Sequence, residues 1–115
     1  MGSVRIRRVY ETSPDGTFRI LVDRIWPRGL SKDRAAVDLW LKEVGPSDRL
    51  RTWFGHDPAR FEEFARRYRQ ELDGAEAFAE LEAAVRDHGS VDLVYSAKDT
   101  EHNQAVVLAD LLGAR

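Results

Sequence analysis

The sequence predicts an α/β fold: a single compact domain with a small mixed, mostly parallel sheet, an N-terminal hairpin and helices packed on the sheet. Three observations lead to this prediction. The 115 residues suit one hydrophobic core, and strand-to-helix units recur twice along the chain. No repeat, linker or low-complexity tract divides residues 1–115, so the whole chain is expected to form one domain.

Two strands are expected near the N-terminus. Val4 and Ile6 alternate with arginines, which is the pattern of a half-buried strand, and residues 18–22 are rich in strand-forming side chains. Between them, residues 13–16 read Ser-Pro-Asp-Gly, with proline and glycine at positions that a type I turn favours. A hairpin is therefore the simplest prediction. Alternation over residues 37–41 fits a further short strand, or a helical turn.

Two helices are expected in the middle of the chain. Ser47 is a suitable N-cap for a short helix whose apolar residues recur at offsets of three and four. Asp57 followed by Pro58 is a strong helix start, because the aspartate caps free N–H groups and proline loses no hydrogen bond at the first position. This second helix is expected to run to about Leu72.

The last third of the chain predicts two helices around a strand. Residues 75–88 form an amphipathic pattern that stops at a glycine, and residues 91–95 then favour a strand. A nearly uniformly apolar helix follows, with Asp99 or Thr100 as its expected N-cap. His102 is then expected in the first helical turn.

Composition excludes several classes of protein. The 18 lysines and arginines against 20 aspartates and glutamates give a formal net charge of -2, which provides no global attraction to nucleic acid or to an anionic membrane. The absence of cysteine excludes disulfides, thiolate nucleophiles and cysteine-ligated metals. No apolar run approaches a membrane span, and the N-terminus does not resemble a signal peptide. A cytoplasmic protein without a membrane partner is expected.

The loop after the second expected strand carries the first candidate ligand-binding residues, Arg24, Trp26 and Arg28. Pro27 forces extended geometry on the tryptophan before it, and the two arginines supply forked N–H donors suited to an anion. The alternative is structural: Asp23 pairs with one arginine to hold the loop, and the tryptophan fills the core. The sequence leaves both interpretations open.

Arg51 and His56 are the second group of candidate ligand-binding residues. Arg51 lies one turn inside the helix that starts at Ser47, where free N–H groups and the helix dipole favour an anion. His56 lies in the turn before the next helix. The structural alternative is stronger here, because Ser47 and Asp57 are explained as caps and Trp53 as a core residue.

The polar run after the last expected strand contains the candidate catalytic residues Lys98, Asp99 and His102, and the candidate ligand-binding residue Asn103. In open α/β sheets, ligands bind beyond the carboxyl ends of the strands. A lysine can hold an anion or act as an acid, and a histidine can transfer a proton, with Asn103 to orient it. The alternative is helix capping and solvation, which accounts for Asp99 in any case.

No metal and no cofactor are expected. His56, Asp57, Asp99 and His102 offer two imidazoles and two carboxylates, but their spacing matches no known ligand signature. The glycines are isolated, so the sequence contains neither a Walker loop nor a dinucleotide fingerprint.

Three motifs connect the chain to a known family. They read VDRIWPRGL at residues 22–30, LRTWFGHDP at 50–58 and YSAKD at 95–99, followed by His102 and Asn103. Together they resemble the YeaO-like family of uncharacterised bacterial proteins, the domain of unknown function 488, over nearly the whole chain. The family typically has leucine at position 25 and alanine near positions 45 and 96, which are mild departures. The resemblance implies a compact cytoplasmic α/β domain and transfers no reaction.

These residues predict a domain that binds an anionic small molecule, phosphate-bearing or carboxylate-bearing, in a pocket lined by arginine, lysine and histidine. Whether the domain also transforms that molecule is left open. One alternative is a nucleic-acid accessory module in which Trp26 or Trp53 stacks on bases. Its basic strand face would contain Arg5, Arg7, Arg8 and Arg19. A second alternative is a non-catalytic homodimer or partner-binding module with exposed aromatic residues at its interface.

Overall fold

A four-stranded sheet forms the centre of the protein in the computed structural model, which describes residues 3–113. The strands lie in the order β1 (Ser3–Arg8), β4 (Ser90–Tyr95), β2 (Phe18–Leu21) and β3 (Leu39–Trp40). All the neighbouring pairs run parallel. The predicted α/β class is confirmed, and β3 is the short strand expected within residues 37–41.

The strand pairing corrects two details of the prediction, the N-terminal hairpin and the mixed character of the sheet. β1 and β2 lie on opposite sides of β4, with Ile6 and Ile20 both level with Leu93. A turn does lie near the predicted place, where the Thr17 N–H donates to the Pro14 carbonyl at 3.2 Å. This turn belongs to a longer loop that returns the chain to the start of the sheet.

β4 lies inside the sheet, between β1 and β2, and is buried along most of its length. Residues 91–95 are all buried, whereas β1 alternates between exposed and half-buried positions, as expected for an edge strand. The connection over residues 9–17 is long enough for a parallel return. Nine extended residues reach about 30 Å, whereas a six-residue strand rises only about 20 Å.

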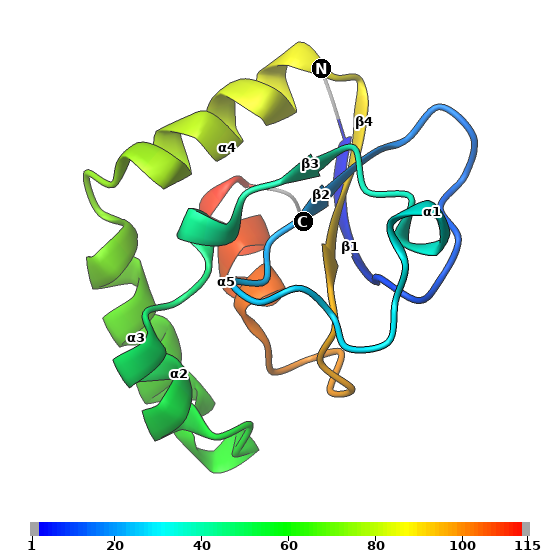
Figure 1. Ribbon diagram of the computed structural model, residues 1–115. Helices are drawn as coiled ribbons and strands as arrows, with labels where there is room; N and C mark the ends of the chain where they lie inside the picture. Colours follow the sequence, from blue (N-terminus) through cyan, green and yellow to red (C-terminus); the bar gives the residue numbers. More distant parts are fainter. Residues whose placement is uncertain (1–2, 114–115) are drawn as a thin grey trace.

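Helices cover the two faces of the sheet unequally. Figure 1 shows α3, α4 and α5 on one side with α2 beside them, and the short α1 on the other side. The helices in chain order are α1 (Lys32–Ala35), α2 (Asp48–Phe54), α3 (Phe61–Leu72), α4 (Glu76–Asp87) and α5 (Gln104–Leu111). Short 3-10 turns, η1 (Lys42–Val44) and η2 (Pro58–Arg60), precede α2 and α3. The predicted helices after Ser47, Asp57 and residue 75 are confirmed.

The main core lies between the sheet and helices α2 to α5. Leu93 of the central strand is fully buried there. Phe64 of α3 stacks on Phe54 of α2, with 4.3 Å between ring centroids. Tyr68 donates its hydroxyl to the Val44 carbonyl, which satisfies a polar group that burial would otherwise make costly. The contact ties α3 to η1, the turn that leads into the site.

A buried polar network holds the opposite face of the sheet. Arg19 on β2 is only 5% exposed, and all five of its guanidinium N–H groups donate hydrogen bonds at 2.7 to 3.2 Å. The acceptors are the carbonyls of Val9, Glu11 and Ala35 and the hydroxyl of Ser13. Buried Asp92 accepts from Arg7 at 2.8 Å beside it. These bonds fasten the loop between β1 and β2 along the sheet, which explains its parallel return.

The start of α5 also differs from the prediction. Asn103, and not Asp99 or Thr100, is the N-cap: its Oδ1 accepts the Val106 N–H at 3.1 Å. Asp99 instead accepts the backbone N–H groups of His102 and of the residue before it, in a separate turn. His102 therefore precedes the helix.

Candidate functional site

A cavity of about 310 Å³ lies at the carboxyl ends of β2 and β4. The loop over residues 23–28, the loop after β4 and the facing parts of α2 and α3 form its walls. Its lining residues are Asp23, Arg24, Ile25, Trp26, Pro27, Arg28, Pro46, Arg51, Phe54, His56, Phe64, Ser96, Ala97 and Gln104. Open α/β sheets bind their ligands at this position. The cavity is therefore the candidate site.

Asp23 is the buried polar group of the cavity, with 8% of the residue exposed. Its Oδ2 accepts the Ser96 N–H at 3.0 Å, and its Oδ1 accepts Nε2 of Gln104 at 2.5 Å. The Trp40 indole fixes the backbone by donating to the Asp23 carbonyl at 2.8 Å. Burial raises the pKa of the Asp23 carboxyl, and the hydrogen bonds from Ser96 and Gln104 oppose that shift.

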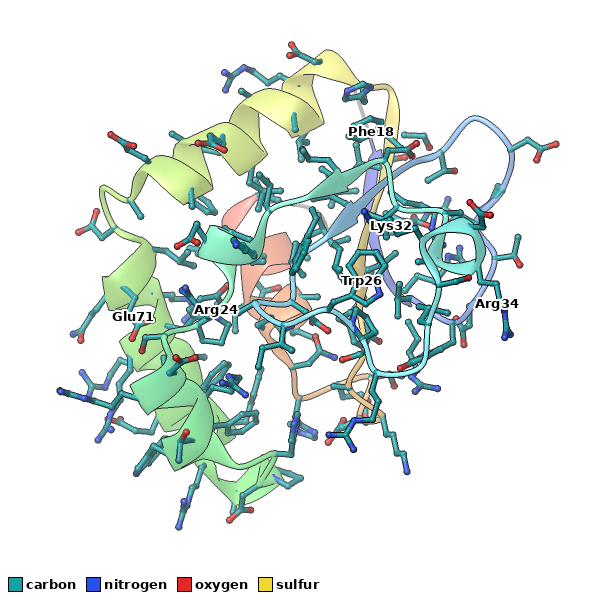
Figure 2. The ribbon with its side chains drawn as sticks, viewed as in Figure 1. Phe18, Arg24, Trp26, Lys32, Arg34 and Glu71 are labelled. Carbon is teal, nitrogen blue, oxygen red and sulfur yellow. The ribbon has the colours of Figure 1, made fainter. Side chains whose placement is uncertain are left out.

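Arg24 lines the cavity but is bound to the protein. Its guanidinium donates to the Pro46 carbonyl at 2.9 Å and to the Gly45 carbonyl at 2.8 Å. In Figure 2 the side chain reaches from the loop after β2 toward the side of α3 that carries Glu71. A Cβ at Gly45 would lie 2.9 Å from the Arg24 backbone nitrogen, so this close approach requires glycine. Arg24 thus fastens the wall of the site.

Cationic side chains also line the cavity. Arg28 is exposed and has no hydrogen bond or ion pair within residues 3–113. Arg51 is held by Asp48 on the same helix, with 2.9 Å between Nη2 and Oδ1. His56 has a left-handed backbone (φ 57°) directly after Gly55 (φ 52°), which turns the chain between α2 and η2 beside the cavity. The predicted ligand-binding residues Arg24, Trp26, Arg28, Arg51 and His56 all line this one cavity.

Apolar side chains form another part of the cavity wall. Ile25, Trp26 and Pro27 contribute from the loop after β2, and Phe54 and Phe64 contribute from the helices. The Trp26 indole N–H donates to a backbone carbonyl four residues later at 2.7 Å, which fixes the orientation of the ring. Figure 2 shows Trp26 between the helical layer and α1, level with the centre of the sheet. This part of the wall is therefore largely aromatic, and its Trp26 ring is held in place.

The four remaining predicted residues are not among those that line the cavity. Asp99 accepts from Nδ1 of His102 at 2.9 Å, and the His102 ring packs edge-on against Phe61 at 5.3 Å. The pKa of the Asp99 carboxyl is lowered, first by the backbone N–H two residues later and then by His102. Asn103 is buried as the helix cap, and Lys98 is exposed. Their predicted roles stay predictions.

No group of three or more histidine, aspartate or glutamate side chains within residues 3–113 is placed to hold a metal ion. None of the described helices is both long and apolar enough to cross a membrane.

Sequence reasoning missed Asp23, Ser96 and Gln104 as site residues. The sequence suggests Asp23 only as the ion-pair partner of an arginine, but Ser96 and Gln104 hold its carboxylate instead. One signal was available. Asp23 is the first polar residue after the buried run 20–22, at the carboxyl end of a strand. Gln104 carried no such signal, because its partner comes from 81 residues away in the sequence.

Comparison with known proteins places the chain in a family. A family model described as the inactive DUF488-N3 subclade matches residues 3–115. The chain belongs to the DUF488 family. Within DUF488, the uncharacterized protein YeaO of Escherichia coli is 40% identical over 112 residues, which cover 96% of each chain. The uncharacterized proteins Rv3073c of Mycobacterium tuberculosis and Mb3100c of Mycobacterium bovis are each 46% identical over 113 residues, 97% of this chain and 95% of theirs.

No solved structure matches the chain. The predicted membership of the YeaO-like DUF488 family is confirmed.

Proposed function

We propose that this DUF488 domain binds a small organic anion in the cavity at the carboxyl ends of β2 and β4, and releases it unchanged. The observation that carries the proposal is the charge of the cavity lining. Three arginines and one histidine line it against a single carboxylate, that of Asp23. An anion that enters therefore meets mainly positive charge.

Arg28 is the principal contact for the anion in this proposal. Arg24 is bound to backbone carbonyls and Arg51 to Asp48, whereas the exposed guanidinium of Arg28 has no partner among the described residues. A free guanidinium can form paired, charge-assisted hydrogen bonds with a carboxylate or a phosphate. His56 supplies a further N–H donor in the same cavity.

The size and lining of the cavity favour an organic anion over an inorganic one. Its volume of about 310 Å³ lies at the lower end of the roughly 300 to 1,000 Å³ of typical ligand sites. Apolar side chains line the cavity together with the buried carboxylate of Asp23 and the exposed Arg28. A ligand gains affinity there only by bringing apolar surface of its own.

Two observations support binding without turnover. The hydrogen-bonded pair of Asp99 and His102, which the sequence suggested for proton transfer, is not part of the cavity lining. The family model that matches the chain is described as an inactive subclade. The predicted catalytic roles of Lys98, Asp99 and His102 therefore do not enter the proposal.

Titration calorimetry with phenyl phosphate and with inorganic phosphate tests this function. We expect phenyl phosphate to bind more tightly, and Arg28→Ala to weaken it about tenfold or more, because hydrogen bonds between charged groups contribute roughly 1.5 to 3 kcal/mol. Arg34→Ala is the matched control, because Arg34 is also exposed and points away from the protein on α1 (Figure 2). Absence of binding at about 10 mM of either anion, or equal losses in the two variants, would overturn the proposal.

A further inference from the structure

The sheet has two edge strands, and β1 is the longer one. It pairs with β4 without a break from Ser3, opposite Ser90, to Arg8, opposite Tyr95, and it contains no proline. The other edge strand, β3, has only two residues. Short length, proline and bulges are devices that protect an edge from pairing with another chain. β1 has none of these three devices, and no other strand of residues 3–113 pairs with its outer side.

The backbone of β1 directs alternate residues to β4 and to the open edge. The N–H groups of Ser3 and Val9, at the two ends of the paired stretch, donate to carbonyls of the β4 segment at 3.0 and 2.7 Å. Because successive N–H groups of a strand point to opposite sides, the N–H groups of Val4 and Ile6 face away from β4. No backbone carbonyl in the described part of the chain accepts them. The open edge therefore offers free donors and acceptors.

The charge on β1 disfavours a second copy of this chain at that edge. Arg5 is exposed, and its side chain has no partner within the described residues. Antiparallel pairing of two copies through both Val4 and Ile6 places Arg5 opposite either Arg5 or Arg7 of the other copy. Like charges directly opposite each other destabilise a sheet, whereas opposite charges stabilise it. The edge is therefore suited to a strand with an acidic residue opposite Arg5.

A groove of about 340 Å³ adjoins the same strand. Its lining includes Arg5 and Ile6 of β1, Val106 of α5, and the carboxylates of Glu101 and Asp110. Apolar side chains that enter this groove are removed from water, whereas acidic ones meet two carboxylates. Because side chains of an added strand alternate between the two faces of the sheet, the residues on either side of its acidic residue are best apolar.

We infer that β1 accepts an extended segment of a partner protein as an additional strand of the sheet. The segment has an acidic residue opposite Arg5 and apolar residues opposite Val4 and Ile6. Backbone hydrogen bonds with the open edge supply the affinity of such a contact, and the alternate side chains supply its specificity. This surface is separate from the anion cavity, because no residue lines both the cavity and the groove beside β1.

Amide hydrogen exchange measured by NMR, with a short peptide as the probe, tests the inference. The probe is acetyl-Thr-Val-Glu-Val-Thr-amide, and a second peptide has lysine in place of glutamate. In the protein alone, we expect the amides of Val4 and Ile6 to exchange faster than those of Arg5 and Arg7. The glutamate peptide should slow exchange at Val4 and Ile6 and bind about fivefold more tightly than the lysine peptide.

Three results would overturn the inference. Slow exchange at Val4 and Ile6 in the concentrated protein alone would show that a second copy covers the edge. Absence of binding at about 5 mM peptide would exclude the site, and spectral changes confined to residues 23–28 would place the peptide in the cavity. A peptide methylated at every backbone nitrogen keeps the side chains but cannot donate to β1, so we expect no binding. Equal affinity of the methylated peptide would exclude strand addition.

Arg5→Glu provides a reversal that damage to the fold would not produce. We expect this variant to bind the lysine peptide about fivefold more tightly than the glutamate peptide. Arg49→Glu is the matched control, because Arg49 is exposed on α2, which lies apart from β1 in Figure 1. It should keep the preference for glutamate. An unchanged preference in Arg5→Glu would show that Arg5 does not select the partner; if this variant does not fold, the two peptides compared on the wild type decide the inference.

Discussion

Arg19 and Asp23 are both buried, with 5% and 8% of their surface exposed, and they lie four residues apart at the two ends of the same short stretch of chain. Arg19 directs all five N–H groups to oxygens of the protein. Asp23 accepts hydrogen bonds from the Ser96 N–H, from the Ser96 side chain and from Gln104, and it borders a cavity. Burial alone therefore does not distinguish a polar residue inside the core from one that lines a cavity.

Replacing Arg19 should have the largest effect on stability. Arg19→Ala leaves the carbonyls of Val9, Glu11 and Ala35 without these donors, so we expect a loss of about 3 to 5 kcal/mol in the free energy of unfolding. The stability of Arg19→Lys should lie between those of the wild type and Arg19→Ala, because lysine offers three donors instead of five. Urea denaturation measures both. The free energy of unfolding of Arg34→Ala should remain within about 0.5 kcal/mol of the wild-type value. A loss in Arg34→Ala as large as that in Arg19→Ala would show that burial of Arg19 does not account for its effect.

Asp92 should show an intermediate effect on the same side of the sheet. Its buried carboxylate accepts from Nε of Arg7 at 2.8 Å and from Ser13 at 2.5 Å. Asp92→Asn keeps the shape but removes the charge, so we expect a loss of about 1 to 3 kcal/mol. Thermal and urea denaturation at neutral pH measure it. An unchanged variant would mean that Arg19 alone holds the loop between β1 and β2.

Asp23 should affect stability less than Arg19, in a way that depends on pH. Burial raises the pKa of its carboxyl above the usual 3.8. A raised pKa in the folded protein stabilises the fold at low pH, and this contribution disappears as the pH rises through the folded pKa. The wild type should therefore lose stability relative to Asp23→Asn between about pH 4 and neutrality, measured by denaturation across that range. A difference that is constant with pH would show that the carboxyl is not desolvated.

Replacing Glu63 should have the smallest effect on stability, because Glu63 is paired with arginines on the exposed surface and not in the core. It accepts hydrogen bonds from Arg66 and Arg67 on α3, which lower the pKa of its carboxyl from 4.5 to about 2. We expect Glu63→Gln to leave the stability at neutral pH unchanged within error, because water and salt screen exposed pairs. Any contribution should vanish in the wild type as the pH falls from about 4.5 toward 2. A loss of stability in Glu63→Gln as large as that in Asp92→Asn would contradict the expectation that buried pairs contribute more than exposed ones.

Local patterns sufficed for most of the fold. The period of apolar residues predicted α3 and α4, and capping chemistry predicted the starts after Ser47 and Asp57. The strand order was beyond such patterns, because it is set by contacts between residues far apart in the sequence, such as the pairing of Ile6 with Leu93. An arginine within a strand gives no sign of where its donors point.

The residues that line the cavity after β2 could be predicted from the sequence, whereas those after β4 were harder to predict. Arg24, Arg28 and His56 were predicted from loop chemistry and all line the cavity. After β4, three residues could each cap the last helix, and the sequence alone does not choose among them. Because Asn103 is the N-cap of α5, Asp99 is not needed there and bonds with His102 instead. Neither Asp99 nor His102 lines the cavity.

The central place of β4 also governs the order in which the chain can assemble. β4 is the last strand to be synthesised, and within the described residues it is the sheet neighbour of β1, with Ser3 and Ser90 paired across 87 positions of sequence. Contacts so distant in sequence slow folding, because the intervening chain must lose entropy before they form. During translation, the edge of β1 that pairs with β4 stays open until residues 90–95 have left the ribosome. The nascent chain therefore depends on late, cooperative closure and is an expected client of chaperones until then.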